Sequence, residues 1–189
     1  MNTIKPNKQY NNYFAIIIID IVLVLHIDIP MCANIVKRLD QYNENHLFFC
    51  EPIKNNIMSE GNFLRILYSN HLFVLNGVHV MFTIYSSCIE KCYNKIKFAF
   101  HPDQNAHTIE RLQFIEESIL AQCPIQNKTP QYKITDQLKN NYLKIFFDST
   151  QSMNNNANTF LLKISGVWET ATHYGVTYKF TKVNYPSVI

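Results

Sequence analysis

The segment Phe160–Val183, "FLLKISGVWETATHYGVTYKFTKV", constrains the fold most, because apolar and polar residues alternate on both sides of a short turn. Alternation with a period of two is typical of a half-buried β-strand, so the segment predicts an antiparallel hairpin. Its polar face carries Lys163 and Lys179, with Val167 also expected on that face. Its predicted apolar positions are Leu162, Ile164, Trp168, Val176, Tyr178 and Phe180.

Further strand-like runs precede this hairpin. They cover Asn62–Ser69, His71–Ser87, Asn94–His101 and Asn141–Ser149, with Asn76-Gly77 as a predicted hairpin turn and an Asn-rich loop at Met153–Asn158. The sequence therefore predicts a mainly β fold with one long helix (β+α), arranged as an OB-like Greek-key barrel.

Helical periodicity is clearest between His107 and Cys123. One face of this predicted helix is formed by Ile109, Leu112, Ile115 and Ile119. Glu116 and Glu117 are expected on its solvated side, and Pro124 ends the run. A shorter helix is expected at Ala33–Tyr42.

The N-terminal segment is the most apolar part of the chain, and it leaves three interpretations open. Phe14–Ile27 has 14 residues, whereas a membrane-spanning helix needs about 18 or more. Asp20 lies in its middle, which disfavours membrane insertion. Residues 1–30 are therefore a dispensable leader, an extra strand, or a membrane or export segment. The domain prediction is an uncertain leader or extra strand at 1–30 and one OB-like nucleic-acid-binding domain at 31–189.

Composition argues against several kinds of catalytic chemistry. Four glycines are too few for Gly-rich nucleotide-binding loops, and no Gly-x-Ser-x-Gly motif occurs. Five cysteines at irregular spacing disfavour a disulfide framework. Cys88, Cys92, His101 and His107 resemble a zinc-finger order, although the strand-like sequence between them disfavours a metal site. We predict a protein that is not an enzyme, with no catalytic residue, metal or cofactor. A metal-dependent enzyme acting through Cys88 and Cys92 is the alternative in that class.

Basic residues recur at non-core positions of the predicted strands, close to aromatic residues. The basic positions are Arg65, Lys97, Lys144, Lys163, Lys179 and Lys182, and the aromatic candidates are Tyr68, Trp168 and Tyr178. Lysine neutralises phosphates and exposed rings stack on bases, as single-stranded nucleic-acid binding requires. Solvated strand faces carry the same pattern, and Trp168 is open to two interpretations, a core residue or a stacking surface.

The hairpin also resembles the C-terminal signature of the single-stranded-DNA-binding proteins of large DNA viruses. The matching positions are Ser165, Gly166, Val167, Trp168, Tyr174, Gly175, Val176, Thr177, Tyr178 and Lys179. A looser match covers "FFCEPIKNNIMSEGNFLRILYSNHLFVLNGVHVMF", which contains Tyr68, and the family's central helix corresponds to Ile109–Ala121. The resemblance runs from about Leu47 to Val183 and leaves residues 1–30 outside.

The resemblance implies sequence-independent binding and protection of single-stranded DNA in viral DNA replication, recombination or repair. It implies viral replication proteins and further copies of the chain as partners, with no membrane association. The implied location is the host nucleus, a viral replication compartment or the virion. The alternative from another class is a viral structural or interaction β-sandwich module, a capsid or tegument component that binds no nucleic acid.

Overall fold

The computed structural model describes residues 15–18, 33–55, 60–146 and 157–183. The chain divides into two compact units, Met1–Val36 and Lys37–Ile189. In the first unit, β1 (Ala15–Ile18) pairs in parallel with the start of β2 (Ala33–Arg38).

The second unit is mainly β, with one long helix and one short one, as the sequence predicts. Its strands are β3 (Leu47–Phe49), β4 (Ile53–Lys54), β5 (Asn62–Ser69), β6 (Val74–Asn76), β7 (Val78–Cys92), β8 (Lys95–Phe100), β9 (Thr129–Gln131), β10 (Tyr142–Phe146), β11 (Ala157–Glu169) and β12 (His173–Lys182). Its helices are α1 (Pro102–Gln122) and α2 (Lys133–Lys139), with 3-10 turns at Leu39–Gln41 and Glu44–His46.

The β11–β12 hairpin is the centre of the sheet. The other edge of β11 pairs first with β7 and then, nearer the turn, with β5. β8 pairs with β7 and β10 pairs with β8, while β9 adds in parallel to β12. β10 lies against β12, but no ladder joins the two among the described strands, so the sheet is not closed into a barrel.

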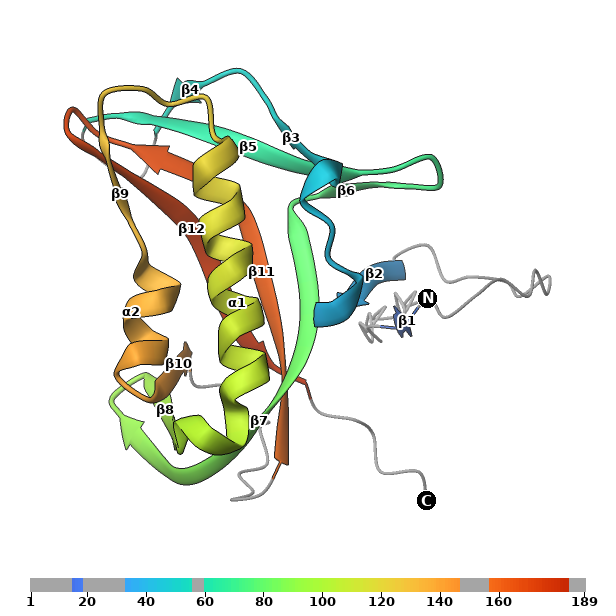
Figure 1. Cartoon of the computed structure of the whole chain (residues 1–189), viewed down its shortest axis with the longest axis vertical. Coiled ribbons are helices and arrows are strands. Elements are labelled where there is room, and N and C mark those ends of the chain that lie inside the picture. Colours follow the sequence, from blue (N-terminus) through green and yellow to red (C-terminus); the bar gives the residue numbers. More distant parts are fainter. Residues whose placement is uncertain (1–14, 19–32, 56–59, 147–156, 184–189) are drawn as a thin grey trace, which may run out of the picture. The chain divides into compact units, whose positions relative to one another are not determined.

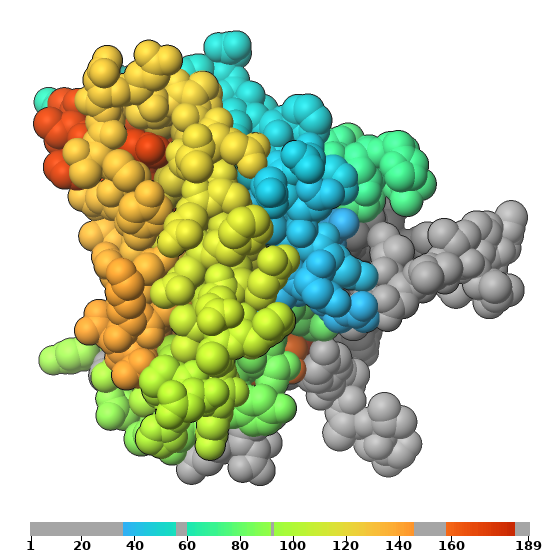
Figure 2. Space-filling model, in the orientation of Figure 1, coloured from blue at the N-terminus to red at the C-terminus, as the bar shows by residue number. Residues whose placement is uncertain are grey.

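Helix α1 covers one face of this sheet, which we call the inner face (Figure 1). Leu112, Ile115 and Ile119 are fully buried there, as their spacing predicts. In Figure 2, α1, α2 and the segment between them cover most of the sheet from this side. The hydrophobic core therefore lies between α1 and the inner face, and among the described residues of this unit no helix lies on the opposite, outer face.

Glu116 contradicts the prediction of a solvated helix face, because its side chain is fully buried. Its two carboxylate oxygens accept hydrogen bonds from the backbone N–H groups of Ile134 (2.9 Å) and Thr135 (2.8 Å). These are first-turn N–H groups of α2, which have no partner within the helix. Burial raises the pKa of Glu116. The carboxylate thus joins α1 to the start of α2, whereas Glu117 is exposed as expected.

Two further local predictions are wrong. The helix expected at Ala33–Tyr42 is the strand β2 followed by a 3-10 turn, since β-branched residues suit the sheet pairing. Asn76-Gly77 is not a hairpin turn, because β6 pairs with β5 rather than with β7. The hairpin lies at Asn70–Phe73, and Gly77, at φ +100°, bends the chain from β6 into β7.

Most of the N-terminal apolar segment, residues 184–189 and most of the Asn-rich loop lie outside the described residues. Within residues 1–30, the structure describes only Ala15–Ile18, which form the strand β1. Within the described part of the chain, no helix has the length and apolar character needed to cross a membrane.

Candidate nucleic-acid interface

A β-bulge at Ser165 determines which side chains of β11 reach the outer face. Up to Ile164, the even-numbered positions face the core. The register against β12 then shifts between Ile164 and Gly166. Val167 consequently takes the inner position and is fully buried, while Trp168 turns to the outer face opposite Gly175. The simple alternation expected from the sequence is wrong beyond Ser165.

The outer face gathers basic and aromatic side chains from four neighbouring strands. Lys163 of β11 lies directly opposite Lys179 of β12 and His79 of β7. Towards the hairpin tip, Gly166 and Trp168 lie opposite Arg65 and Phe63 of β5. We call this set the outer-face patch: Phe63, Arg65, His79, Lys163, Trp168 and Lys179.

The electrostatics of the patch favour an anion. Residues directly opposite on antiparallel strands have Cβ atoms about 4.5–5.5 Å apart, and like charges there are destabilising. Lys163 and Lys179 are both exposed. Burial, and to a lesser extent the nearby Lys163 ammonium, lowers the pKa of His79. The outward positions of β5, β7 up to Tyr85, β11 from Thr159 and β12 are all described, and none of them is acidic.

The two aromatic rings of the patch rest on glycines. A Cβ at Gly175 would lie 2.8 Å from Cζ2 of Trp168, and one at Gly166 would lie 2.4 Å from Cζ of Phe63. Both separations are shorter than a carbon–carbon contact permits, so glycine is what lets each ring lie close to the sheet. Trp168 is partly buried against Gly175 on the outer face and does not seal the core.

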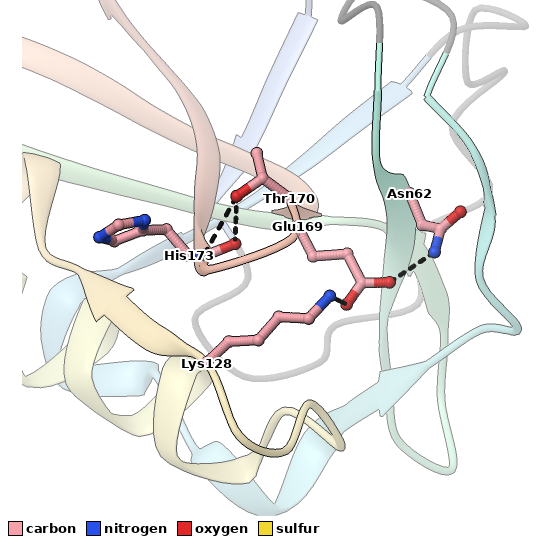
Figure 3. Close-up of polar contacts among 5 residues, drawn as sticks. All are labelled: Asn62, Lys128, Glu169, Thr170 and His173. Atoms are coloured by element: carbon pink, nitrogen blue, oxygen red, sulfur yellow. Dashed lines mark hydrogen bonds and ion pairs between the residues drawn. The ribbon is translucent and has the colours of Figure 1, made fainter.

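The hairpin tip that carries Trp168 is anchored by Glu169 (Figure 3). One carboxylate oxygen accepts a hydrogen bond from Asn62 of β5 (2.6 Å), and the other pairs with Lys128 before β9 (2.7 Å). These contacts with Lys128 and Asn62 lower the pKa of Glu169. Across the turn, the Thr170 N–H donates to the His173 carbonyl (2.8 Å), and the His173 N–H donates to the Thr170 hydroxyl (3.0 Å). Contacts with β5, with the segment before β9 and across the turn therefore hold the hairpin tip, and with it Trp168, in place.

The structure brings together Arg65, Lys163, Trp168 and Lys179 of the predicted site, but not Tyr68. The Tyr68 ring is 1% exposed and stacks on Tyr42, while its hydroxyl accepts a hydrogen bond from the Asn43 N–H (2.8 Å). A ring in this position offers no face to a base. In the alternation of β5, Tyr68 shares the inward face with Leu64 and Ile66, whereas Arg65 faces outward.

Lys182 and Tyr178 lie on the inner side of β12. The Lys182 ammonium sits 5.8 Å from the centre of the Phe98 ring, and burial lowers the pKa of this lysine. The Tyr178 hydroxyl accepts a hydrogen bond from the Gln137 amide of α2, and burial raises its pKa to about 12.

Lys97 and Lys144 form a second pair of directly opposed lysines, on β8 and β10. Here Glu90 lies 3.5 Å from the Lys97 ammonium, which also lies 5.1 Å from the centre of the Tyr142 ring. This pair is thus partly neutralised, whereas Lys163 and Lys179 form no ion pair with the residues that the structure describes.

Phe63, His79 and Tyr142 are interface candidates that the sequence did not reveal. Phe63 and His79 occupy outward positions of predicted strands, so the alternation of each strand contains the signal that identifies them. Tyr142 becomes a candidate only through its neighbours on α2, an element that the sequence did not predict.

No three His, Cys, Asp or Glu side chains lie together in the described ranges in a way that could hold a metal ion. Cys50, Cys88 and Cys123 are free thiols. A zinc site involving Cys88 gains no support from this part of the chain.

Comparisons of the chain with family models, with curated proteins and with solved structures found no match.

Proposed function

We propose that the protein binds single-stranded DNA without sequence specificity and protects it during viral DNA replication, recombination or repair. The observation that carries this proposal is the outer-face patch. It places three exposed cations, Arg65, Lys163 and Lys179, beside the rings of Trp168 and Phe63 on a face whose described outward positions hold no acid. Cations and rings on one surface are what sequence-tolerant single-strand binding requires.

The fold is compatible with this proposal. OB-folds are partly open, five-stranded Greek-key barrels that bind oligonucleotides. Here the sheet would reach such a barrel by closing between β10 and β12, which already lie in contact. We propose that the second unit is an open relative of that architecture.

Fluorescence anisotropy with a labelled oligo-dT, at low and at high salt, tests the proposal. We expect binding at low salt that weakens as salt rises, because the lysines replace counterions on the phosphates. Lys163→Ala and Lys179→Ala should each weaken binding. Each should also reduce the slope of log K against log salt by about 0.7, the value for one phosphate of a single strand.

Lys91→Ala is the matched control, because it removes one exposed lysine from the far end of β7, beyond the part that pairs with β11. It should leave both affinity and slope nearly unchanged. Absence of binding at micromolar protein in low salt would overturn the proposal. So would a loss of affinity in Lys91→Ala as large as that in Lys163→Ala.

A further inference from the structure

A groove of about 590 Å³ opens where the β12 edge of the sheet meets α2 and β10. Its lining includes three aromatic side chains, three polar side chains of α2 and the residue that follows α2: Tyr142, Trp168, Tyr178, Lys133, Asp136, Gln137 and Asn140. We call it the edge groove. Its volume falls within the range of about 300–1,000 Å³ typical of small-molecule sites. Because Trp168 belongs to both, the edge groove adjoins the outer-face patch.

We propose that the edge groove binds one nucleobase of a single strand whose phosphates follow the outer-face patch. This inference rests on the proposed function. It adds α2 and β10 to the interface and assigns the bases and the phosphates to different surfaces.

The aromatic side of the groove is held in place from both ends. Gln137 donates its amide N–H to the Tyr178 hydroxyl and accepts a hydrogen bond from the Lys144 backbone N–H (3.0 Å) with its amide oxygen. Trp168 is held against Gly175. Gln137 thus fixes the Tyr178 ring, with both ends of its amide bonded to the protein. A pre-positioned ring loses little side-chain entropy when a base stacks on it.

The polar groups of the groove suit a base better than a phosphate. Asn140 donates to the Asp136 carbonyl (2.7 Å), which leaves its own amide oxygen as an acceptor. Lys133 and Asp136 are exposed and form no ion pair within the described part of the chain. A base edge carries both donors and acceptors and can use an ammonium, a carboxylate and an amide oxygen, whereas the Asp136 carboxylate repels a phosphate.

The chain contains one tryptophan, so its fluorescence reports on Trp168 alone. The test compares an oligo-dT with an abasic oligonucleotide of the same length, which carries the same phosphates and no bases. Both should bind in anisotropy competition, but only oligo-dT should strongly quench Trp168.

Tyr142→Ala separates the groove from the patch, because Tyr142 lines only the groove. Base stacking contributes about 1–3 kcal/mol, so we expect this substitution to weaken oligo-dT binding by about tenfold and to leave abasic binding unchanged. Tyr142→Phe should retain the affinity, since the ring remains. Tyr93→Ala, which removes a tyrosine that is 99% exposed at the β7–β8 turn, is the matched control. The circular-dichroism melting curve of each variant verifies its fold.

The outcomes separate the two proposals. If both oligonucleotides bind but Trp168 emission is unchanged, or if Tyr142→Ala weakens both equally, the groove proposal is overturned and the proposed function stands. If neither oligonucleotide binds, both proposals are overturned.

Discussion

Glu169 and Glu116 are buried carboxylates in opposite electrostatic settings. The Lys128 ammonium and the Asn62 amide stabilise the charged form of Glu169 and lower its pKa. Glu116 accepts hydrogen bonds from two backbone N–H groups, which lower its pKa. The effect of burial is larger, so the pKa of Glu116 is raised. Each one joins elements that are distant in sequence, the hairpin tip to β5 and α1 to α2.

The lowered pKa of Glu169 predicts a loss of stability in acid. The unfolded chain has a glutamate pKa of about 4.3, so the contribution of Glu169 is fully present above that pH. It is lost as the pH falls through the lower folded-state pKa. In urea unfolding, wild type should therefore be more stable than Glu169→Gln near neutral pH, and the difference should shrink in strong acid. A difference that is constant with pH would contradict this assignment. Lys128→Ala should reduce the same pH dependence.

At the scale of elements, sequence pattern was informative where packing follows a simple period. The core face of α1 and the ends of β5 matched their predictions, because one side of each element faces a continuous core. The outward orientation of Arg65, Lys163 and Lys179 is predictable for the same reason. Lys163 precedes the bulge of β11, and the other two lie on strands with no bulge at these positions.

Other elements depend on contacts that no local pattern contains. α2 has seven residues, too few for a stable isolated helix, and its first turn is completed by Glu116 from another element. β9 is a three-residue strand held by β12. The position of Tyr68 is not predictable from the pattern, because a tyrosine in a strand is compatible with either face, and here its hydroxyl accepts a hydrogen bond from the Asn43 backbone N–H.

Gly175→Ala tests how β12 supports Trp168. The new Cβ would lie 2.8 Å from Trp168 Cζ2 and 3.0 Å from the Gln131 carbonyl oxygen, so the indole must move. We expect a destabilisation of about 1–3 kcal/mol by overpacking and a shift of the tryptophan emission maximum. Denaturant unfolding and the emission spectrum measure the two effects. Thr177→Ala, on the same strand and the same face, should change the emission far less. An unchanged spectrum in Gly175→Ala would show that the ring does not depend on this glycine.

At the scale of the whole molecule, the second unit carries both the core and the interface. Its main hydrophobic cluster begins at Leu39, and every residue of the outer-face patch and of the edge groove lies beyond that position. In the described part of the chain, this cluster, the outer-face patch and the edge groove include no residue of 1–30.

A protein comprising residues 31–189 should therefore fold cooperatively and bind oligo-dT as the full chain does. Its melting temperature and its affinity by anisotropy measure this directly against the full-length protein. An aggregated product, or a marked loss of melting temperature, would show that the first thirty residues complete the fold, which is the extra-strand interpretation of that segment.

The bulge at Ser165 makes the aromatic surface depend on the length of the strand as much as on its residues. Ser165 is one extra residue in the two-residue repeat of β11, so each later side chain of the strand points to the face opposite to the one that simple alternation predicts. Deleting that one residue would restore a regular strand and still leave valine inward and tryptophan outward, whereas a regular strand that kept every residue would direct tryptophan toward the core and valine outward. Relatives of this protein should therefore be aligned at this strand by the position of the insertion, since a relative without the bulge keeps the same two faces of the hairpin tip only if it is one residue shorter there.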